Sequence, residues 1–270
     1  MLATLKEVLE KAEQGNYAVG AFNCTSLESG MAIVETAEEL NSPVILQYAD
    51  SHRHLISIDV IGPIMLQLAK IAKVPVVVHL DHGASIESCR HAVDMGFTSV
   101  MYDASAKPFE DNVAETRSVV EYAHERGASV EAELGHILTS KAGAAEGNGK
   151  SYTREEAYTD PEMAKEFIER TNVDALAIGF GTAHGIYTEK PILDLNRIAL
   201  IKSAKDIPYV MHGGSGLSEE EYRTAIHNGI RKINYYTYLS LAGGRGVMQY
   251  LEDKKDKDAI YFEDIAKAGI

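Results

Sequence analysis

The sequence predicts an α/β protein with the (β/α)8 architecture of a TIM barrel, folded as a single domain over residues 1–270. Two observations favour this class. Short apolar segments of strand length alternate with longer segments whose apolar residues recur at helical spacing. The chain length is also close to the roughly 250 residues that such a barrel commonly needs. A doubly wound open sheet is the alternative architecture, and no linker divides the chain.

Eight segments are expected to form strands. Most are continuous apolar runs rather than clean alternations, which is typical of parallel strands that are buried on both faces. In chain order, the expected strands are Tyr17–Phe22, Pro43–Ala49, Pro75–Leu80, Thr98–Tyr102, Ala128–Leu134, Asp174–Phe180, Ile207–Met211 and Ile230–Tyr235.

Helices are expected between these strands. Most of the candidate segments begin at a serine or an acidic residue, and several end at a glycine or asparagine, which are common residues at the two ends of a helix. The clearest candidates are Ser26–Asn41, Ser85–Gly96, Glu110–Gly127, Asp160–Thr171 and Ser218–Gly229.

One segment interrupts the alternation of strands and helices. Residues 135–159 are polar and rich in glycine and alanine, with no strand or helix pattern. A loop of this length in a compact domain is usually functional or mobile. Because it follows the fifth expected strand, we expect a mobile loop over the mouth of the barrel.

Composition restricts the partners of the chain. The net charge is −14, which would repel a nucleic-acid backbone. A small phosphorylated ligand is still compatible, because backbone N–H groups at a helix N-terminus bind phosphate without net positive charge. The longest apolar stretches are too short to span a bilayer, so no membrane partner is expected. Two cysteines, Cys24 and Cys89, and an N-terminus unlike a secretory signal indicate a cytoplasmic protein.

Three histidines follow apolar segments in glycine-rich settings: V-V-V-H-L-D81-H82-G, G-T-A-H184-G and V-M-H212-G-G-S-G. They can meet only if the strands before them are parallel and adjacent. Three neutral imidazoles around an open fourth position make a catalytic zinc site. We therefore predict that His82, His184 and His212 bind Zn²⁺, although each one alone would be read as a solvated loop histidine. His79 shares the strand face of Asp81 and is expected to be packed.

Carboxylates follow the same strands. Asp81 directly precedes His82 and is placed to shuttle a proton; holding a histidine tautomer is the alternative role. Asp103 and Glu133 end the fourth and fifth expected strands. They are expected to form a second, weaker metal position or to orient the ligands, with structural hydrogen bonding at the barrel top as the alternative.

A phosphate site is expected near the end of the chain. The loop Gly213-Gly214-Ser215-Gly216 precedes a helix that begins near Ser218, and such a loop exposes N–H groups to an anion. Loops after strands seven and eight of a barrel recurrently bind phosphate. Asn234 and Thr237, at and just beyond the end of the eighth expected strand, would complete the site. Tight turns need glycine in any case, which is the alternative explanation.

These residues make the chain similar to the class II, zinc-dependent ketose-bisphosphate aldolases, a family that includes fructose-bisphosphate and tagatose-bisphosphate aldolases. The resemblance extends from A-V-G-A-F-N23 to K-I-N234-Y-Y-T237. V-M-Y-D103-A-S resembles the end of the family's fourth strand. The most specific motifs are H-L-D81-H82-G, V-E-A-E133-L-G, G-T-A-H184-G-I-Y and H212-G-G-S215-G.

The resemblance implies a lyase of carbohydrate metabolism, of the glycolytic type. It would reversibly cleave a ketose 1-phosphate or bisphosphate, by default fructose 1,6-bisphosphate, to dihydroxyacetone phosphate and an aldehyde through a zinc-stabilised enediolate. Asp81 would exchange the proton of the hydroxyl on the acceptor carbon, and Glu146 on the long loop is the candidate for the second proton transfer. A monovalent cation, Na⁺ or K⁺, and a homodimer or homotetramer are also expected.

The resemblance further assigns contacts with the substrate. Asn23 and Ser51 would line the pocket, and Tyr236 would face the sugar. Dihydroxyacetone phosphate would be bound by Gly185, Gly213, Gly214, Ser215, Asn234 and Thr237.

The chain departs from the family pattern at three places. Tyr236 stands where the fructose-bisphosphate enzymes have aspartate and the tagatose-bisphosphate enzymes resemble alanine, so a different aldehyde is expected to fit. The cluster Ser51-His52-Arg53-His54 would suit a phosphate, sulfonate or carboxylate on the acceptor, unless it is a solvated loop. The family usually continues beyond residues like 264–270, so a shortened C-terminal helix is expected.

Three alternative functions follow from the same residues. The first is an aldolase for tagatose bisphosphate or for a deoxy, acidic or sulfonated sugar phosphate. The second is a zinc sugar-phosphate isomerase or epimerase, which would use the same enediolate. The third is a noncatalytic partner subunit of an aldolase, although the intact Asp81, His82, His184 and His212 argue against it.

Overall fold

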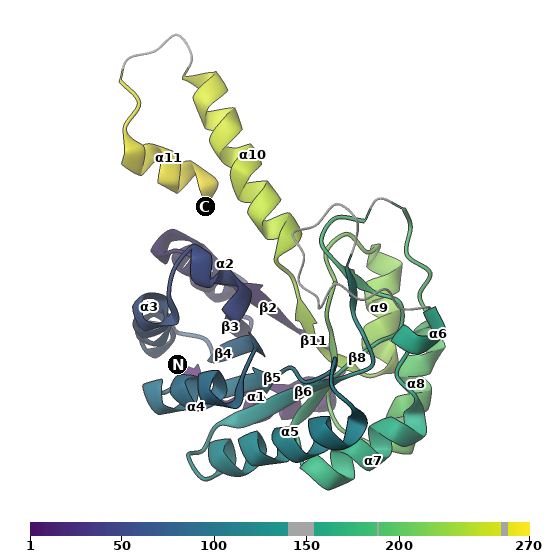
Figure 1. Ribbon diagram of the computed structural model, residues 1–270. Helices are drawn as coiled ribbons and strands as arrows, with labels where there is room; N and C mark the ends of the chain where they lie inside the picture. The colour runs from purple at the N-terminus through teal and green to yellow at the C-terminus, as the bar shows by residue number, and fades with distance from the viewer. Residues whose placement is uncertain (140–153, 188, 255–258) are drawn as a thin grey trace.

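The fold is a closed barrel of eight parallel strands surrounded by helices (Figure 1), in a computed structural model that describes residues 1–139, 154–187, 189–254 and 259–270. The strands follow one another around the barrel in the order β4-β3-β2-β11-β10-β8-β6-β5, and β5 pairs again with β4. Because this last pairing closes the sheet, the (β/α)8 prediction is confirmed and the open sheet is excluded.

All eight expected strands are present, and their ends differ from the expected ones by at most three residues. Every pairing between neighbouring barrel strands is parallel. The strands are β2 Val19–Asn23, β3 Val44–Ala49, β4 Val76–Gly83, β5 Ser99–Tyr102, β6 Ser129–Leu134, β8 Ala175–Ile178, β10 Tyr209–Met211 and β11 Ile230–Asn234.

The five helices that the sequence predicts are present and begin within one residue of the expected positions. Ser26, Ser85 and Ser218 each cap the following helix with a side-chain hydrogen bond to the third residue of that helix, in a reciprocal capping box. The surrounding helices are α1 Leu5–Gly15, α2 Leu27–Glu39, α3 Ile58–Ile71, α4 Ile86–Met95, α5 Phe109–His124, α7 Pro161–Thr171, α8 Leu195–Ala204 and α9 Glu219–Asn228.

The lower part of the barrel interior is apolar. Leu5, Val8 and Leu9 of α1 pack against inward-facing strand residues such as Ile45 and Val77. The short strand β1, Leu2–Ala3, pairs with the start of β4 beside this contact. Helix α1 therefore closes the N-terminal end of the barrel, and the opposite end, where the strands finish, is left for polar residues.

Several short elements lie above the strand ends. The 3-10 helix η1, Asp50–His54, follows β3. Residues 135–159 are not uniformly without structure, because strand β7 (Leu138–Thr139) and helix α6 (Arg154–Ala157) lie within them, and β7 pairs with strand β9 (Ala183–His184). Residues 140–153, including Glu146, lie outside the described part of the chain.

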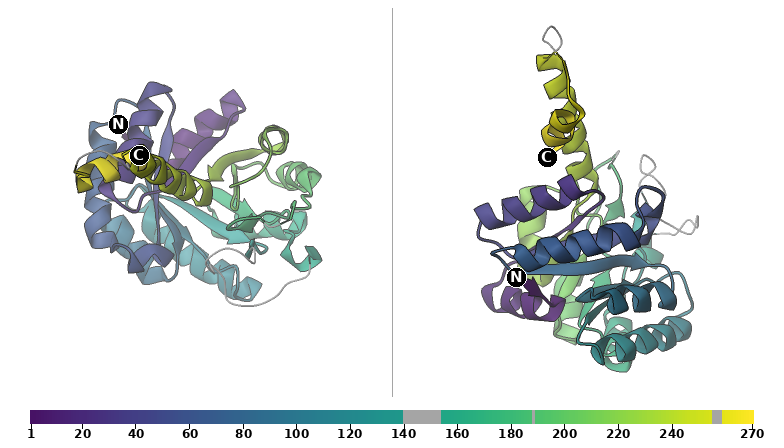
Figure 2. Two further views of the ribbon diagram at one scale, coloured as in Figure 1. Left: turned by 90° about the horizontal axis from the view of Figure 1, so that it is seen from above. Right: turned by 90° about the vertical axis from the view of Figure 1, so that its left-hand side faces the viewer.

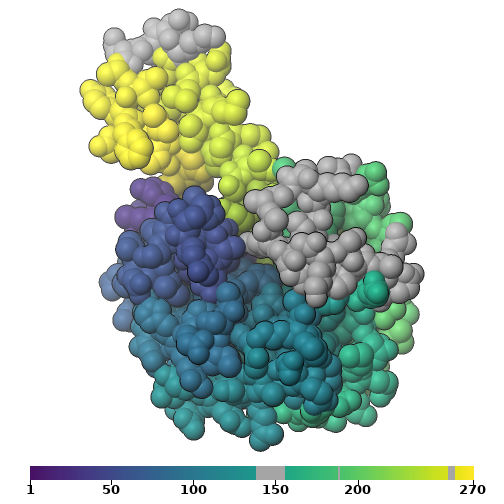
Figure 3. Space-filling view, in the orientation of Figure 1, coloured from purple at the N-terminus to yellow at the C-terminus, as the bar shows by residue number. Residues whose placement is uncertain are grey.

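The last two helices form an arm that projects beyond the barrel (Figures 1 to 3). This C-terminal arm consists of α10 (Thr237–Asp253) and α11 (Phe262–Gly269). The helices approach closely because α10 carries glycines; a Cβ at Gly246 would lie 2.3 Å from the Ala268 carbonyl oxygen. Neither helix has a buried residue. The shortened C-terminal helix and the single-domain boundary stay predictions.

In the part of the chain that the structure describes, no helix is both long enough and apolar enough to cross a membrane.

Candidate active site and metal centre

A cavity of about 520 Å³ opens at the C-terminal ends of the barrel strands. It contains every residue that the sequence assigned to substrate binding, together with Asp81 and two of the three expected metal ligands. His212 lies beside the cavity and is fully buried. The lining residues are Asn23, Ser51, His52, His54, Asp81, His82, His184, Gly185, Ile186, Gly213, Gly214, Ser215, Asn234, Tyr236, Thr237, Ser240 and Leu241.

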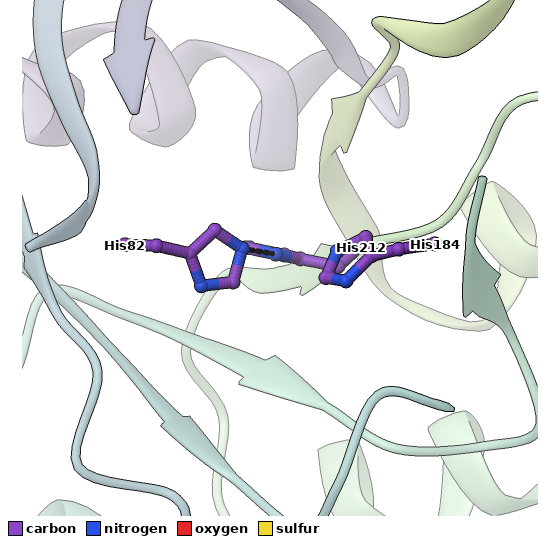
Figure 4. A group of neighbouring side chains, drawn as sticks. All are labelled: His82, His184 and His212. Atoms are coloured by element: carbon purple, nitrogen blue, oxygen red, sulfur yellow. Dashed lines mark hydrogen bonds between the residues drawn. The ribbon is translucent and has the colours of Figure 1, made fainter. Parts of the chain in front are cut away.

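The three histidines meet at one point (Figure 4). The ring centroid of His82 lies 4.6 Å from that of His212 and 5.2 Å from that of His184, and the His184 and His212 centroids are 5.8 Å apart. One nitrogen from each ring lies within 4.8 Å of the others. The structure therefore brings together side chains that are separated by up to 130 residues in the chain.

His82 reaches this point because its backbone departs from the regular strand. Alternation along β4 would turn His82 away from the face that Asp81 occupies. His82 instead has a left-handed φ of 48°, and the pairing of β4 with β5 shifts in register between Leu80 and Gly83. Gly83 is required next to it, since a Cβ there would lie 2.7 Å from the Met101 carbonyl oxygen. This bulge lets two consecutive residues, Asp81 and His82, line the same cavity.

His184 is positioned by a loop and does not end a barrel strand as the sequence suggested. Strand β8 ends at Ile178, and His184 lies on the separate strand β9. The Tyr187 hydroxyl donates to the Gly213 carbonyl at 2.9 Å and accepts from the Ala183 N–H at 2.8 Å. Gly213 has a φ of +66°, and a Cβ there would lie 2.5 Å from the Ala183 carbonyl oxygen. These contacts hold His184 against the residue that follows His212.

Carboxylates orient two of the imidazoles. Asp103 Oδ2 lies 2.8 Å from His82 Nδ1, and Glu131 Oε1 lies 2.9 Å from His212 Nε2. With these nitrogens occupied, His82 Nε2 and His212 Nδ1 face each other at 2.9 Å. His184 Nδ1 is buried and has no hydrogen-bond partner among the described residues. Each of the three histidines brings one ring nitrogen within 4.8 Å of the others, and two of the rings are oriented by carboxylates. This arrangement is typical of histidines that share a metal ion, so the residues fit a metal.

The protonation of the three rings differs. Burial disfavours the charged form of His82, but the Asp81 charge and the Asp103 hydrogen bond raise its pKa well above the usual value. Burial and the His82 charge lower the pKa of His184 to about 3. Burial also lowers the pKa of His212. Because metal ligation requires neutral imidazoles, a bound metal ion would displace any proton from the ligating nitrogens.

Asp103 and Glu133 lie beside His82 and could hold a second cation. The group His82, Asp103 and Glu133 also brings its ligand atoms within 4.8 Å of one another. Asp103 is already engaged, because its Oδ1 accepts hydrogen bonds from Ser105 at 2.7 and 3.1 Å. Burial, and then the charge of Asp103, raises the pKa of Glu133 well above its usual value. The geometry agrees with the orienting role for Asp103, and the second metal position stays a prediction.

Asp81 is held by three side-chain amides. Asn234 donates to Oδ1 at 3.0 Å, while Asn23 and Gln47 donate to Oδ2 at 3.3 and 3.2 Å. Burial opposes ionisation of Asp81, but the charges of His82 and Lys232 lower its pKa well below the usual value. Asp81 is therefore an ionised, fixed hydrogen-bond acceptor at the cavity wall.

Three buried polar residues near the site are absent from the sequence-based set. Gln47, Glu131 and Lys232 are fully buried inside the barrel. Their positions could have been found from strand alternation, because Glu131 lies two residues before Glu133 and Lys232 two residues before Asn234. The same rule correctly predicted that His79 is packed: it is fully buried, with Nδ1 2.8 Å from Ser99 Oγ.

The residues expected to bind phosphate come from the loop after β10 and from the start of α10. Gly213, Gly214 and Ser215 of the loop and Thr237, the first residue of α10, all line the cavity. Helix α9 is a poorer anion site than expected, because Ser218 already caps it and its first turn carries three glutamates. Helix α10 has no acidic residue in its first turn.

Another part of the cavity wall comes from the segment after β3 and from Tyr236. The rings of His52 and Tyr236 pack with centroids 4.6 Å apart and an angle of 50°. His52 is 7% exposed, whereas Arg53 is exposed and donates to the Asp50 carbonyl at 3.1 Å. Residues 51–54 are therefore neither a uniform cationic cluster nor a fully solvated loop, since Ser51, His52 and His54 line the cavity.

Comparison with known proteins agrees with this site. The sequence model of the family described as fructose-bisphosphate aldolase class-II matches residues 3–269. The chain is 40% identical to fructose-bisphosphate aldolase from Staphylococcus aureus over 94% of this chain and 88% of that protein. It is 39% identical to the enzyme of the same name from Staphylococcus epidermidis over the same shares of the two chains.

Among solved structures, the YdjI aldolase from Escherichia coli K12 superposes with a TM-score of 0.83 at 35% sequence identity, over 100% of this chain and 93% of that one. A family match over almost the entire sequence, with relatives of this identity and coverage, establishes that the chain belongs to the class II fructose-bisphosphate aldolase family.

Proposed function

We propose that this aldolase reversibly cleaves a ketose 1-phosphate or ketose bisphosphate, with fructose 1,6-bisphosphate as the default substrate, to dihydroxyacetone phosphate and an aldehyde. The observation that carries the proposal is the meeting of three imidazoles and Asp81 at one cavity, which the glycine-rich loop Gly213-Gly214-Ser215 also lines. The relatives named fructose-bisphosphate aldolase support the default substrate.

The proposed metal is Zn²⁺, held by His82, His184 and His212. The donor set of three neutral imidazoles is typical of catalytic zinc, and carboxylates orient two of the rings. When bound, Zn²⁺ supplies Lewis-acid chemistry that draws charge from the oxygens of the reacting carbonyl and hydroxyl groups.

Asp81 is proposed to move the proton of the reaction. In cleavage it accepts the proton from the hydroxyl on the carbon that becomes the aldehyde, and in condensation it returns that proton. The amides of Asn23, Gln47 and Asn234 hold the carboxylate in one orientation for this transfer. Glu146 is proposed for the second proton transfer, at the donor carbon; it lies outside the described residues.

Substrate contacts are proposed along the length of the cavity. Gly185, Gly213, Gly214, Ser215 and Thr237 would bind the phosphate of dihydroxyacetone phosphate, with Asn234 beside its reacting carbons. None of the described lining residues is a lysine or an arginine. A Na⁺ or K⁺ ion would therefore supply the counter-charge that the phosphate lacks, and this is the role we propose for a monovalent cation.

The acceptor aldehyde is proposed to bind between Asn23, Ser51 and Tyr236. The phenol of Tyr236 and the packed His52 ring narrow this wall and make it partly aromatic. Because of this wall, we propose as alternative substrates tagatose bisphosphate or a deoxy, acidic or sulfonated sugar phosphate. Because the acceptor wall differs from the family pattern while the metal and phosphate ends do not, we expect the chemistry to be shared and the aldehyde to differ.

We also propose a homo-oligomer, a dimer or a tetramer. Large apolar side chains stay exposed on the C-terminal arm and the segment before α11, among them Met248 (71%), Tyr261 (63%) and Phe262 (78%). An apolar surface of this kind on a projecting helix pair marks an interaction site. We propose a second copy of this chain as the partner, because wherever the protein is made other copies of it are present.

The cytoplasm is the proposed location. The buried thiols of Cys24 and Cys89 are free, and burial raises the pKa of both, that of Cys24 to about 11. Two unpaired thiols of low reactivity suit a reducing compartment.

The decisive experiment is proton exchange on dihydroxyacetone phosphate alone. The zinc-loaded protein is incubated with this compound in heavy water, with and without a chelator, and the carbon that bears the free hydroxyl is followed by NMR. We expect stereospecific deuterium uptake that the chelator abolishes, followed by condensation when aldehydes are added. Exchange and sugar interconversion without release of dihydroxyacetone phosphate would favour an isomerase or epimerase. Absence of exchange with zinc bound, and of condensation with every aldehyde, would favour the noncatalytic subunit.

A further inference from the structure

A buried ion pair lies inside the barrel directly below the candidate site. Lys232 Nζ of β11 is 2.9 Å from Glu131 Oε2 of β6, and both side chains are fully buried. An ion pair in the interior loses hydration that its mutual attraction often fails to restore, and apolar residues of similar size would often be as stable. Stability alone therefore does not explain why charges occupy this position, and their other contacts become informative.

Lys232 determines the orientation of the Asn234 amide. Its Nζ donates to Asn234 Oδ1 at 2.7 Å, so the amide nitrogen of Asn234 must point to the opposite side. There Nδ2 donates to Asp81 Oδ1 at 3.0 Å. An amide turned by half a rotation would place its oxygen against the Asp81 carboxylate and repel it. The ammonium group of Lys232 thus selects the rotamer of Asn234 that binds the proposed base.

Glu131 determines the orientation of the His212 ring. Its Oε1 lies 2.9 Å from His212 Nε2, while its other oxygen faces Lys232. A carboxylate in this position fixes the proton of a neutral imidazole on the nitrogen beside it and leaves the other nitrogen free as a ligand. For His212 that other nitrogen is Nδ1, which faces His82.

We propose that Glu131 and Lys232 are positioning residues that couple the proposed base to a proposed metal ligand. One ion pair holds His212 through Glu131 and Asp81 through Lys232 and Asn234, so the two groups that must act on one substrate share a single support. The inference rests on the proposed roles of Asp81 and His212. Neither Glu131 nor Lys232 lines the cavity, so both act through other residues.

The test compares Lys232→Met with Lys202→Met. Lys202 is the matched control, because its Nζ also contacts a glutamate, Glu13, at 2.6 Å and a backbone carbonyl, that of Ile207, at 3.1 Å, but it does not line or support the cavity. For Lys232→Met we expect kcat to fall about 10- to 100-fold with KM little changed. We also expect altered visible absorption of the Co²⁺-loaded protein and weaker metal retention against a chelator. Lys202→Met should change only the melting temperature.

A double variant, Lys232→Met with Glu131→Gln, is included in case the single variant does not fold. It removes both charges of the pair, so neither residue is left as a buried charge without its partner. We expect the double variant to fold and to keep the loss of kcat and the altered Co²⁺ spectrum. Wild-type kcat and spectrum in the double variant would overturn the proposal. If the wild-type protein itself shows no exchange on dihydroxyacetone phosphate, the proposed function fails, whereas the Co²⁺ spectrum and the chelator competition still decide whether the ion pair positions His212.

Discussion

At the scale of single residues, Asp81 has a role that can be separated from metal binding. Its oxygens accept amide hydrogen bonds, whereas the nitrogens that could bind a metal ion belong to the histidines. We expect Asp81→Ala to retain bound metal, and we expect its kcat to fall by about 10²- to 10⁴-fold, which is the usual contribution of a general base. Metal content by atomic absorption and steady-state cleavage rates give the comparison. Turnover close to that of the wild type would remove Asp81 from the mechanism.

Substitution of Tyr236 tests whether this side chain selects the acceptor aldehyde, and the same substitution at the neighbouring Tyr235 is the control. Tyr236 lines the cavity, whereas Tyr235 packs against Phe22 with ring centroids 6.2 Å apart. We expect Tyr236→Ala to change the ratio of kcat/KM between a small and a large acceptor aldehyde by roughly 10-fold or more, as expected when apolar contact is removed. The ratio should be unchanged in Tyr235→Ala. Equal ratios in both variants would show that Tyr236 does not select the acceptor.

The residue types of the candidate site were predictable because they follow apolar strands. His82, Asp103 and His212 end or follow strands that are apolar runs, and polar residues with this chemistry stand out there. Glu131 and Lys232 were harder to find because they lie within strands, where a charged residue contradicts the expected burial. Each of the two residues forms an ion pair with the other across the barrel, and the sequence does not show which strands face each other there.

At the scale of elements, strands and helices were predictable but the local departures from them were not. Apolar runs and serine caps are local properties, so β3, β4 and the start of α4 follow from the sequence. The left-handed backbone at His82 and the transfer of His184 to β9 arise from contacts with β5 and with the loop after β10. Histidine is more common than most residues at positive φ, but this preference is too weak to predict the conformation of one residue.

The turn at Gly213 is expected to control the meeting of His184 and His212. Gly213 and Gly127 both have a positive φ, but a Cβ at Gly213 would lie 2.5 Å from Ala183 O, and nothing lies within 4 Å at Gly127. We expect Gly127→Ala to cost about 1 to 2 kcal/mol of unfolding free energy from backbone strain alone. Gly213→Ala should cost more and weaken metal binding, as measured by denaturant unfolding and by chelator competition. Equal metal affinity in the two variants would contradict this role for the turn.

At the scale of the whole molecule, metal binding should link distant parts of the barrel. The three histidines come from β4, β9 and the segment after β10, so a bound ion joins the two halves of the chain. A ligand at 100 times its Kd stabilises a folded protein by about 2.7 kcal/mol. We expect Zn²⁺ to raise the melting temperature of the wild type and not of His212→Ala. An equal rise in both would place the ion elsewhere.

The C-terminal arm is expected to control the number of subunits. Met248 and Phe262 are 71% and 78% exposed on the arm, and Leu40, at the end of α2, is equally exposed at 72% on the barrel. We expect light scattering to show a dimer or tetramer for the wild type and for Leu40→Lys. The double variant Met248→Lys with Phe262→Lys should become monomeric. A monomeric wild type would refute the proposed assembly.

The adjacency of Asp81 and His82 has a consequence for motion. Consecutive Cα atoms across a trans peptide are separated by about 3.8 Å, whatever the rest of the fold does. When the barrel deforms thermally, or when the acceptor wall is changed by mutation, the proposed proton carrier Asp81 and the proposed metal ligand His82 are displaced together, because a peptide bond joins them. We therefore expect substitutions in the neighbouring loops to alter which aldehyde enters while the backbone positions of Asp81 and His82 stay coupled.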